Sequence, residues 1–214
     1  MKTLTKETQQ AITPAFALEL LKKGNDRFVQ NLKINRNLLQ QASETSDGQH
    51  PFAVILSCID SRTSAELIFD QGLGDIFSVR IAGNIVNEDI LGSMEFGCKV
   101  AGAKIIVVLG HTKCGAVKGA CDHVEMGHLT GLLSKITPAV NNEVDTKENR
   151  NANNANFVEN VSALNVNHSV QSIVESSPIL RELIEVGQIG IIGGMHDIAT
   201  GDVVFYPNQF NKLD

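Results

Sequence analysis

The sequence predicts an α/β fold with a mostly parallel central sheet, an antiparallel edge strand and flanking helices. Short apolar segments alternate along the chain with segments in which apolar residues recur at helical spacing. The apolar segments lack polar alternation, which is typical of parallel strands covered on both faces. The last two lie close together in the sequence, which indicates an antiparallel hairpin at one edge of the sheet.

The individual elements follow from the spacing of apolar residues. Residues 14–31 carry one apolar face with Pro14 in the first turn, and predict an N-terminal helical arm. Thr63-x-x-Glu66 matches a capping box and predicts a short helix that ends near Phe69. Strands are predicted at 52–57, 76–80, 104–110, 188–192 and 202–205. Further helices are predicted at 88–101, 115–121, 129–140, 157–175 and from Pro178, with polar connections at 32–50 and in the Asn-rich segment 141–156.

Length and composition predict a single domain over residues 1–214. Apolar residues make up 43% of the chain and charged residues 20%, enough for a substantial core. A formal charge of −6 argues against a general nucleic-acid binder, which needs clustered Lys and Arg. No apolar segment is long enough to cross a bilayer, and the polar start lacks a secretory signal. We therefore expect a cytoplasmic protein without membrane contact, if the chain begins at its native start.

Two motifs that carry chemistry stand directly after predicted strands. Cys58-Ile-Asp60-Ser-Arg62 follows strand 52–57, and His111-Thr-Lys-Cys114 follows strand 104–110. In an open parallel sheet, ligands bind outside the carboxyl ends of the strands, where the chain crossovers diverge. The two motifs are therefore expected to point into the same crevice.

Two thiolates and one imidazole favour zinc, which takes sulfur and nitrogen ligands in tetrahedral geometry. Neither motif contains a further His or Cys, and three protein ligands with one open position are typical of catalytic zinc. Each motif alone has a plainer interpretation, because free Cys is often a small core residue and a nearby Asp–Arg pair is often a loop salt bridge. Their placement at two strand ends favours the metal site.

These residues resemble the β-class carbonic anhydrases, and the resemblance covers most of residues 49–125. It extends over 52–57, Phe69–Phe77, Val79–Asn84, Gly92–Phe96 and 105–121. The resemblance implies the fold of that family and reversible hydration of carbon dioxide with one zinc ion per subunit. It also implies roles for named residues, with Cys58, His111 and Cys114 as zinc ligands and Asp60 with Arg62 as the catalytic pair.

The resemblance implies a substrate-binding set of four residues. Gln49 would hydrogen-bond the substrate, Phe77 would form an apolar wall, and the Gly115 N–H would donate to bicarbonate. Phe96 stands where the plant-like subgroup often has Tyr, so a hydroxyl contact is missing. A second subgroup has Trp in a regulatory bicarbonate site, where this chain has Ile55 and no Trp anywhere. We therefore expect the plant-like subgroup without bicarbonate-driven inactivation.

The expected mechanism assigns separate tasks to the catalytic pair. Asp60 would accept a hydrogen bond from the attacking water, and Arg62 would keep Asp60 ionised and oriented. At low pH, the resemblance implies, Asp60 can leave Arg62 and become a fourth metal ligand in an inactive closed form. Because two thiolates neutralise the charge of zinc, we expect activity to rise through the alkaline range.

Other Cys and His residues are expected to have plainer roles. Cys98 and Cys121 are predicted to be core residues, because free cysteine behaves as a small hydrophobe. His123 and His128 are candidates for proton relay, although exposed loop histidines usually have no specific role.

Alternatives to a carbonic anhydrase remain open. One is a related zinc hydrolase of carbon disulfide or carbonyl sulfide, and the other is a non-catalytic zinc or thiol module. The resemblance also implies a homodimer or homotetramer, with the N-terminal helix on the neighbouring subunit and the active cleft at the interface.

Overall fold

A computed structural model describes residues 3–207 and 210 and contains one sheet in the order β2-β1-β3-β4-β5. The first four strands are mutually parallel, and β5 runs antiparallel to β4 at the edge. The predicted fold class is therefore confirmed. The strands span Ala53–Ser57 (β1), Ile76–Arg80 (β2), Ile105–His111 (β3), Gly190–His196 (β4) and Val203–Tyr206 (β5).

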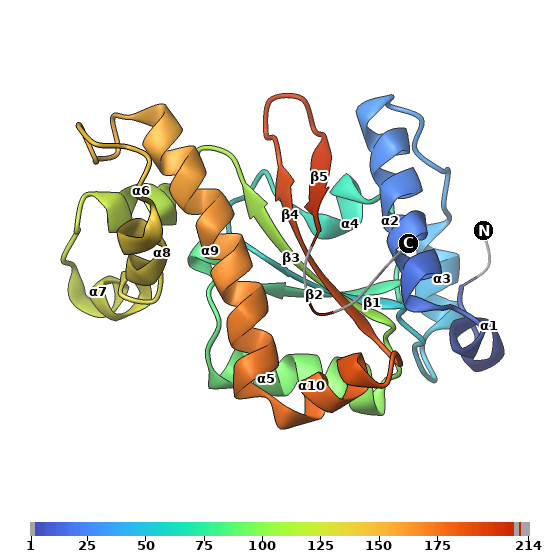
Figure 1. Ribbon diagram of the computed structural model, residues 1–214. Helices are drawn as coiled ribbons and strands as arrows, with labels where there is room; N and C mark the ends of the chain where they lie inside the picture. Colours follow the sequence, from blue (N-terminus) through green and yellow to red (C-terminus); the bar gives the residue numbers. More distant parts are fainter. Residues whose placement is uncertain (1–2, 208–209, 211–214) are drawn as a thin grey trace.

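The order of strands places a crevice between β1 and β3. From β1 the chain first crosses to β2 on one side and then returns to β3 on the other side of β1 (Figure 1). The crossovers therefore diverge at the carboxyl ends of β1 and β3, where Ser57 is the register partner of Leu109. Segments that follow these two strands start side by side.

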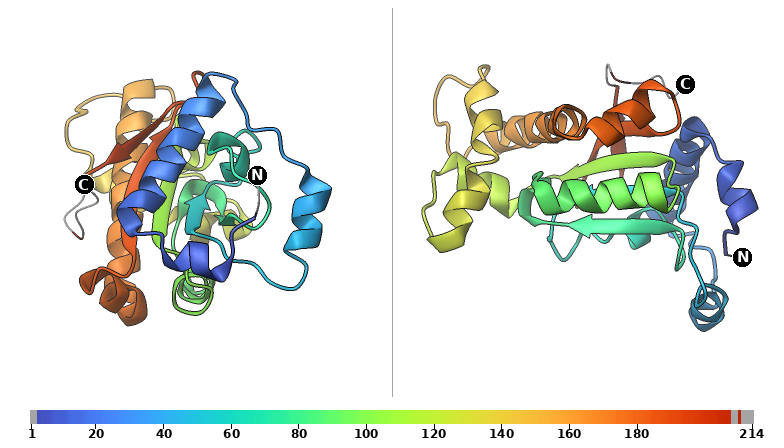
Figure 2. Two further views of the ribbon diagram at one scale, coloured as in Figure 1. Left: turned by 90° about the vertical axis from the view of Figure 1, so that its right-hand side faces the viewer. Right: turned by 90° about the horizontal axis from the view of Figure 1, so that it is seen from below.

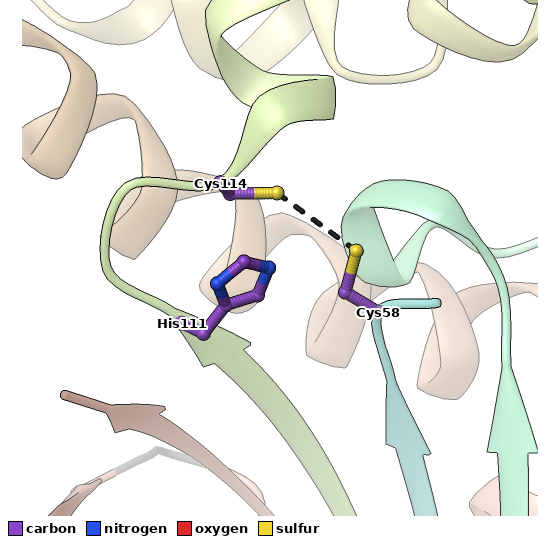
Figure 3. A group of neighbouring side chains, drawn as sticks. All are labelled: Cys58, His111 and Cys114. Atoms are coloured by element: carbon purple, nitrogen blue, oxygen red, sulfur yellow. Dashed lines mark hydrogen bonds between the residues drawn. The ribbon is translucent and has the colours of Figure 1, made fainter. Parts of the chain in front are cut away.

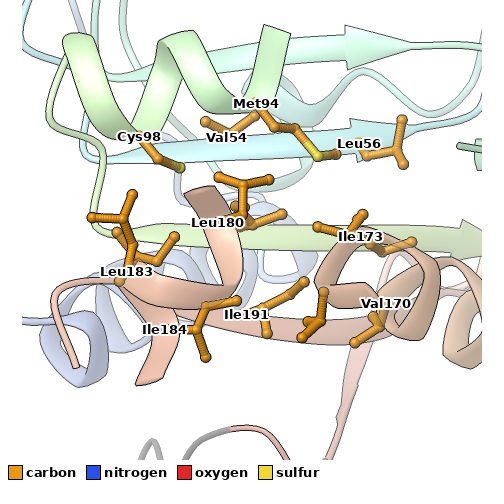
Figure 4. Close-up of a cluster of buried hydrophobic side chains, with 14 of the residues drawn as sticks. Val54, Leu56, Met94, Cys98, Val170, Ile173, Leu180, Leu183, Ile184 and Ile191 are labelled. Atoms are coloured by element: carbon orange, nitrogen blue, oxygen red, sulfur yellow. The ribbon is translucent and has the colours of Figure 1, made fainter. Parts of the chain in front are cut away.

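Helices cover both faces of the sheet. The helices α5 (Glu88–Glu95), α9 (Ala155–Ser176) and α10 (Pro178–Glu185) pack on one face, against Val54 and Leu56 of β1 (Figure 4). On the opposite face lie α2 (Pro14–Val29) and α4 (Ala65–Ile68), packed against the alternate residues of the same strands (Figure 2). Since β1 and β3 are buried at every position, both faces of these strands are apolar, as predicted.

A third apolar cluster lies beyond the carboxyl ends of the strands. It is built from α6 (Gly115–Cys121), α7 (Gly127–Leu133), α8 (Thr137–Asn142) and the first turns of α9. Cys58 and Cys114 belong to this cluster. Apolar packing therefore borders the crevice between the carboxyl ends of β1 and β3 on the side away from the sheet.

Several helix predictions differ from the structure. The short helices α1 (Lys6–Gln10) and α3 (Leu38–Glu44) were not specifically predicted, because neither has an apolar period and each depends on an N-cap side chain. The predicted helix 88–101 is α5 followed by a π-helix, Phe96–Val100. The single helix predicted at 129–140 is wrong, because Pro138 starts a second helix, α8, in the first turn.

The capping box predicted at Thr63 is also wrong. Helix α4 begins after Ser64, and the Thr63 hydroxyl donates to the Cys58 and Asp60 carbonyl oxygens instead. Glu66 accepts from the hydroxyls of Ser64 and Ser78. Thr63 therefore stabilises the loop that carries the first motif. Among the described residues, the model has no helix that is long and apolar enough to cross a membrane.

Candidate metal centre

The three predicted ligands come from the two loops at the switch point. Cys58 directly follows β1, His111 is the last residue of β3, and Cys114 precedes the first turn of α6. The backbone between them turns sharply, since Lys113 has a φ of 58° in the left-handed region. This turn brings Cys114 back over the end of β3. The predicted convergence of the two motifs is present in the structure (Figure 3).

The ligand atoms have the spacing of a tetrahedral zinc site. One ligand atom from each of Cys58, His111 and Cys114 lies within 4.8 Å of the others, and all three residues are buried. The two sulfur atoms are 4.0 Å apart, too far for a disulfide. A tetrahedral zinc with Zn–S bonds of about 2.3 Å would separate them by about 3.8 Å. Among the described residues, no further His, Cys or carboxylate joins the group.

One buried atom of this group lacks a partner inside the protein. His111 Nε2 is buried and makes no hydrogen bond, whereas His111 Nδ1 is 3.0 Å from the Thr112 carbonyl oxygen. A carbonyl can only accept, so it fixes the proton on Nδ1 and leaves the Nε2 lone pair free. A buried unpaired acceptor is costly, and a metal ion would satisfy it. The donor set therefore fits a zinc ion.

The two thiols differ strongly in acidity. The pKa of Cys58 is lowered to about 4, chiefly by the hydrogen bond from Cys114 and, against the effect of burial, by the Gly83 N–H. The pKa of Cys114 is raised, first by its hydrogen bond to Cys58 and then by burial. Without a metal, one thiolate therefore shares the proton of the other thiol. Binding of a divalent ion would release that proton.

Comparison with known proteins identifies the family. The sequence model of the carbonic anhydrase family matches residues 53–203. The chain belongs to the carbonic anhydrases. It is 36% identical over 197 residues to a carbonic anhydrase of Mycolicibacterium smegmatis, covering 89% of this chain and 92% of that protein. It is 34% identical over 210 residues to carbonic anhydrase 2 of Mycobacterium tuberculosis, with coverage of 89% and 92%.

The similarity extends to solved structures of the β class. A tetrameric β-carbonic anhydrase from Sordaria macrospora matches with a TM-score of 0.68 and 26% identity, covering 75% of this chain and 82% of that one. The family model spans the chain from the first residue of β1 to the first residue of β5. Both loops of the metal centre are therefore part of the shared family core, and the chain is of the β class.

Asp60 and Arg62 form a close pair beside the metal centre. Arg62 Nε and Nη2 donate to the two carboxylate oxygens of Asp60 at 2.9 and 2.7 Å, and the Arg62 N–H donates at 3.0 Å. These bonds hold the pKa of Asp60 far below its usual range. Arg80 donates to the carbonyl oxygens of Cys58 and Asp60 at 3.0 and 2.6 Å. Asp60 is therefore an ionised acceptor on a fixed loop.

The predicted substrate-binding residues lie at different distances from the ligands. Gly115 follows Cys114 and lies at the metal centre, with open space where a side chain would be. Phe77 lies on β2 opposite Val54, about 13 Å along the strand direction from Cys58, and its ring centroid is 6.3 Å from that of Phe96.

Gln49 lies before the start of β1, so the full length of that strand separates it from Cys58. Ile55 stands at the position of the regulatory Trp. It is fully buried in the apolar cluster on the face of the sheet covered by α2 and α4. One chain therefore brings together the predicted ligands, the predicted catalytic pair and Gly115, but not Gln49, Phe77 or Phe96.

Two cysteines and two histidines outside the metal centre lie in the surroundings that the sequence predicts. Burial raises the pKa of Cys98 to about 12 and, with a smaller contribution from the Asp122 charge, that of Cys121 to about 11. Both thiols are core residues. His123 and His128 are exposed.

The sequence analysis missed Gly83, which lies in the loop after β2. Its N–H donates to Cys58 Sγ at 3.3 Å. Because β2 is parallel to β1, its carboxyl end reaches the same edge of the sheet. The parallel arrangement was the available signal that this third loop contacts the metal centre.

Proposed function

We propose that this protein catalyses the reversible hydration of carbon dioxide to bicarbonate, with one zinc ion per subunit held by Cys58, His111 and Cys114. The observation that carries the proposal is the buried sulfur–nitrogen–sulfur group with an unpartnered His111 Nε2, in a chain of the carbonic anhydrase family. Zinc bound there would supply a Lewis acid that lowers the pKa of a water molecule.

The residues around the ion have separate tasks in this proposal. Asp60 is ionised and accepts the hydrogen bond of the attacking water, which aims the water lone pair at the substrate carbon. Arg62 restricts Asp60 to one orientation through its two parallel hydrogen bonds. The N–H of Gly115 donates to the substrate oxygen that gains negative charge. All three tasks depend on groups at the same edge of the sheet.

We propose that a second copy of the chain supplies the rest of the substrate pocket. Phe96 is 55% exposed, and it borders an open groove of about 780 Å³ beside β2 together with Phe77 and Val79. The β2 strand pairs only with β1 among the described residues, so its outer edge is available to a partner. A homodimer or homotetramer would place Gln49, Phe77 and Phe96 of one copy near the ligands of the other, with the N-terminal helix on the neighbouring subunit.

Four further properties belong to the proposal. Asp60 contacts Arg62 in this structure, and the closed form would require these bonds to break so that Asp60 could bind the ion. Ile55 in place of Trp supports the plant-like subgroup without regulatory bicarbonate. A cytoplasmic location is supported by four free cysteines, which a reducing compartment preserves. Activity that rises through the alkaline range remains a prediction.

Metal analysis and substrate assays test the proposed function directly. We expect one zinc per chain and hydration of carbon dioxide, with no comparable hydrolysis of carbon disulfide or carbonyl sulfide. Cys58→Ala should lose both zinc and activity. Cys98→Ala is the matched control, because it removes a buried thiol from the core without touching the ligands. Zinc with four protein ligands at every pH and no hydration would instead support a non-catalytic module.

A further inference from the structure

The loop after β2 reaches the metal centre through one backbone group. Residues Ile81–Asn84 form a tight turn that is closed by the Asn84 N–H, which donates to the Ile81 carbonyl oxygen at 3.0 Å. Within the turn, the N–H of Gly83 donates to Cys58 Sγ at 3.3 Å. Gly83 and Cys58 are both buried. This loop therefore contributes a hydrogen bond to a metal ligand but no ligand of its own.

The turn has a backbone conformation that few residues can adopt. Gly83 has a φ of 67° and Asn84 a φ of 43°, so both are in the left-handed region, which glycine adopts freely but asparagine only at some cost. A side chain at position 83 would be strained at this φ, and its Cβ would approach Ile136 Cδ1 to 2.6 Å. Such a turn persists only where its surroundings hold it.

Helix α9 supplies the groups that hold the turn. Asn165 Nδ2 donates to the Gly83 carbonyl oxygen at 2.8 Å, and Ser169 Oγ donates to the Asn84 carbonyl oxygen at 3.0 Å. Asn165 is 1% exposed and Ser169 2%, so water does not compete for these bonds. The two side chains anchor successive carbonyls of the turn, both from residues that are distant in sequence. They fix the direction in which the Gly83 N–H points.

We infer that Asn165 is a positioning residue of the metal centre, which acts by holding the Gly83 N–H on Cys58 Sγ. This inference rests on the proposed function, because it assumes that Cys58 binds the ion. A hydrogen bond to a metal-binding sulfur fixes the orientation of the sulfur, so that it is held ready to bind the ion. Groups that orient metal ligands typically change metal affinity or activity 10–100-fold when they are removed.

A comparison of Asn165→Ala with Ser162→Ala tests the inference. Ser162 is also buried on α9, but its hydroxyl donates to the Val158 carbonyl oxygen of the same helix and not to the turn. The first readout is the sulfur-to-metal charge-transfer band of the cobalt(II)-substituted protein. The second is the rate of zinc transfer to a chromogenic chelator. We expect Asn165→Ala to shift the band and release zinc about tenfold faster, while Ser162→Ala resembles the parent protein.

The same measurements define the results that overturn the inference. A folded Asn165→Ala protein with the parental band and release rate overturns it, and so does an equal change in Ser162→Ala. If Asn165→Ala does not fold, Ser169→Ala is measured instead. It should give a smaller shift of the same sign, and parental values would then overturn the inference.

Measurements on the parent protein separate this inference from the proposed function. A parent that binds zinc but does not hydrate carbon dioxide would refute the proposed function and leave both readouts meaningful. A parent that takes up no metal would refute both. A zinc-loaded, active parent whose Asn165→Ala variant is indistinguishable from it would refute the inference alone.

Discussion

Two aspartates near the start of the region matched by the family model each pair with arginine, but in different surroundings. Asp60 pairs with Arg62 in the loop after β1, where the side chains are 17% and 54% exposed. Asp70 follows α4, is 4% exposed, and pairs with Arg27 of α2 and Arg36 of the following loop. The first pair lies at an opening beside the metal centre, and the second lies inside the protein.

The partners explain the different roles of the two aspartates. Arg62 is close to Asp60 in sequence, so the pair needs only its own loop to form. Asp70 takes its partners from distant residues and also accepts from the Ile34 N–H at 3.3 Å, so it ties the N-terminal arm to the core. An ion pair at a solvent opening can rearrange during catalysis, whereas a buried pair with several bonds holds one structure. The comparison therefore separates the carboxylate that we propose to be catalytic from a structural one.

The largest effect is expected from Asp70→Asn. The substitution removes the carboxylate with which Arg36 forms its ion pair, and the Arg36 side chain is only 7% exposed. Removal of one partner of a buried pair costs about 3 kcal/mol of the free energy of unfolding. Denaturant unfolding followed by circular dichroism measures this loss. The folded fraction should keep its zinc and its rate of carbon dioxide hydration. A stability equal to that of the parent would show that Asp70 has no structural role.

Asp60→Asn makes the same chemical change, but it should lower the rate of the reaction, whereas Asp70→Asn lowers stability. The amide accepts a hydrogen bond less strongly and also presents N–H groups, so the attacking water loses its fixed orientation. We expect the rate of carbon dioxide hydration to fall about 100-fold with zinc content unchanged. Stopped-flow hydration with parallel metal analysis measures both quantities. Loss of zinc in this variant would indicate that Asp60 supports the ligands and not the reaction.

The two ion pairs also differ in how far the sequence alone could predict them. The loops at Cys58 and His111 were predictable, because each motif is local and follows a long apolar segment that had to be a buried strand. The parallel sheet then required both loops to lie at one edge. The roles of Asp60 and Arg62 came from the family resemblance, which those same local motifs carried.

The sequence could not predict contacts between distant segments. Arg36 lies in a polar segment expected to be a loop or a short irregular helix, so nothing indicated that it is buried against Asp70. Likewise, nothing within α9 distinguishes Asn165 from the other asparagines of the same helix, and only the folded structure places it on Gly83. The substrate-binding residues proposed on β2 and before β1 would act only together with a partner chain, which one sequence does not specify.

Acid pH should weaken the contribution of Asp70 to stability. Burial alone would raise the pKa of Asp70, but the bonds from Arg27 and Arg36 outweigh it, and the pKa is lowered in the folded protein. In the unfolded chain the pKa of this aspartate is about 3.9. As the pH falls, Asp70 is therefore protonated in the unfolded state before it is protonated in the folded state. The contribution is complete above about pH 5 and is lost as the pH falls through the lower, folded-state pKa.

Unfolding free energies from pH 6 down to pH 3 measure this dependence, with metal-free parent and Asp70→Asn proteins compared at each pH. The difference between the two proteins should be constant at the upper end of the range and shrink toward the lower end. A difference that is independent of pH would mean that the Asp70 charge does not contribute.

The smallest expected effect is that of Arg62→Ala on thermal stability. Because Arg62 is more than half exposed, water replaces most of the interaction that Asp60 loses, and exposed ion pairs contribute little to folding. The melting temperature should stay within about 2 °C of the parent value, whereas Arg36→Ala should lower it by several degrees because the buried Asp70 loses one of its two arginine partners and keeps only Arg27. Differential scanning calorimetry of the two zinc-loaded variants measures both shifts. Arg62→Ala could instead lose as much stability as Arg36→Ala. The loop at Asp60 would then be held by the same kind of structural ion pair as the N-terminal arm. In that case the exposure of the two pairs would not distinguish the aspartate proposed for catalysis from the structural one.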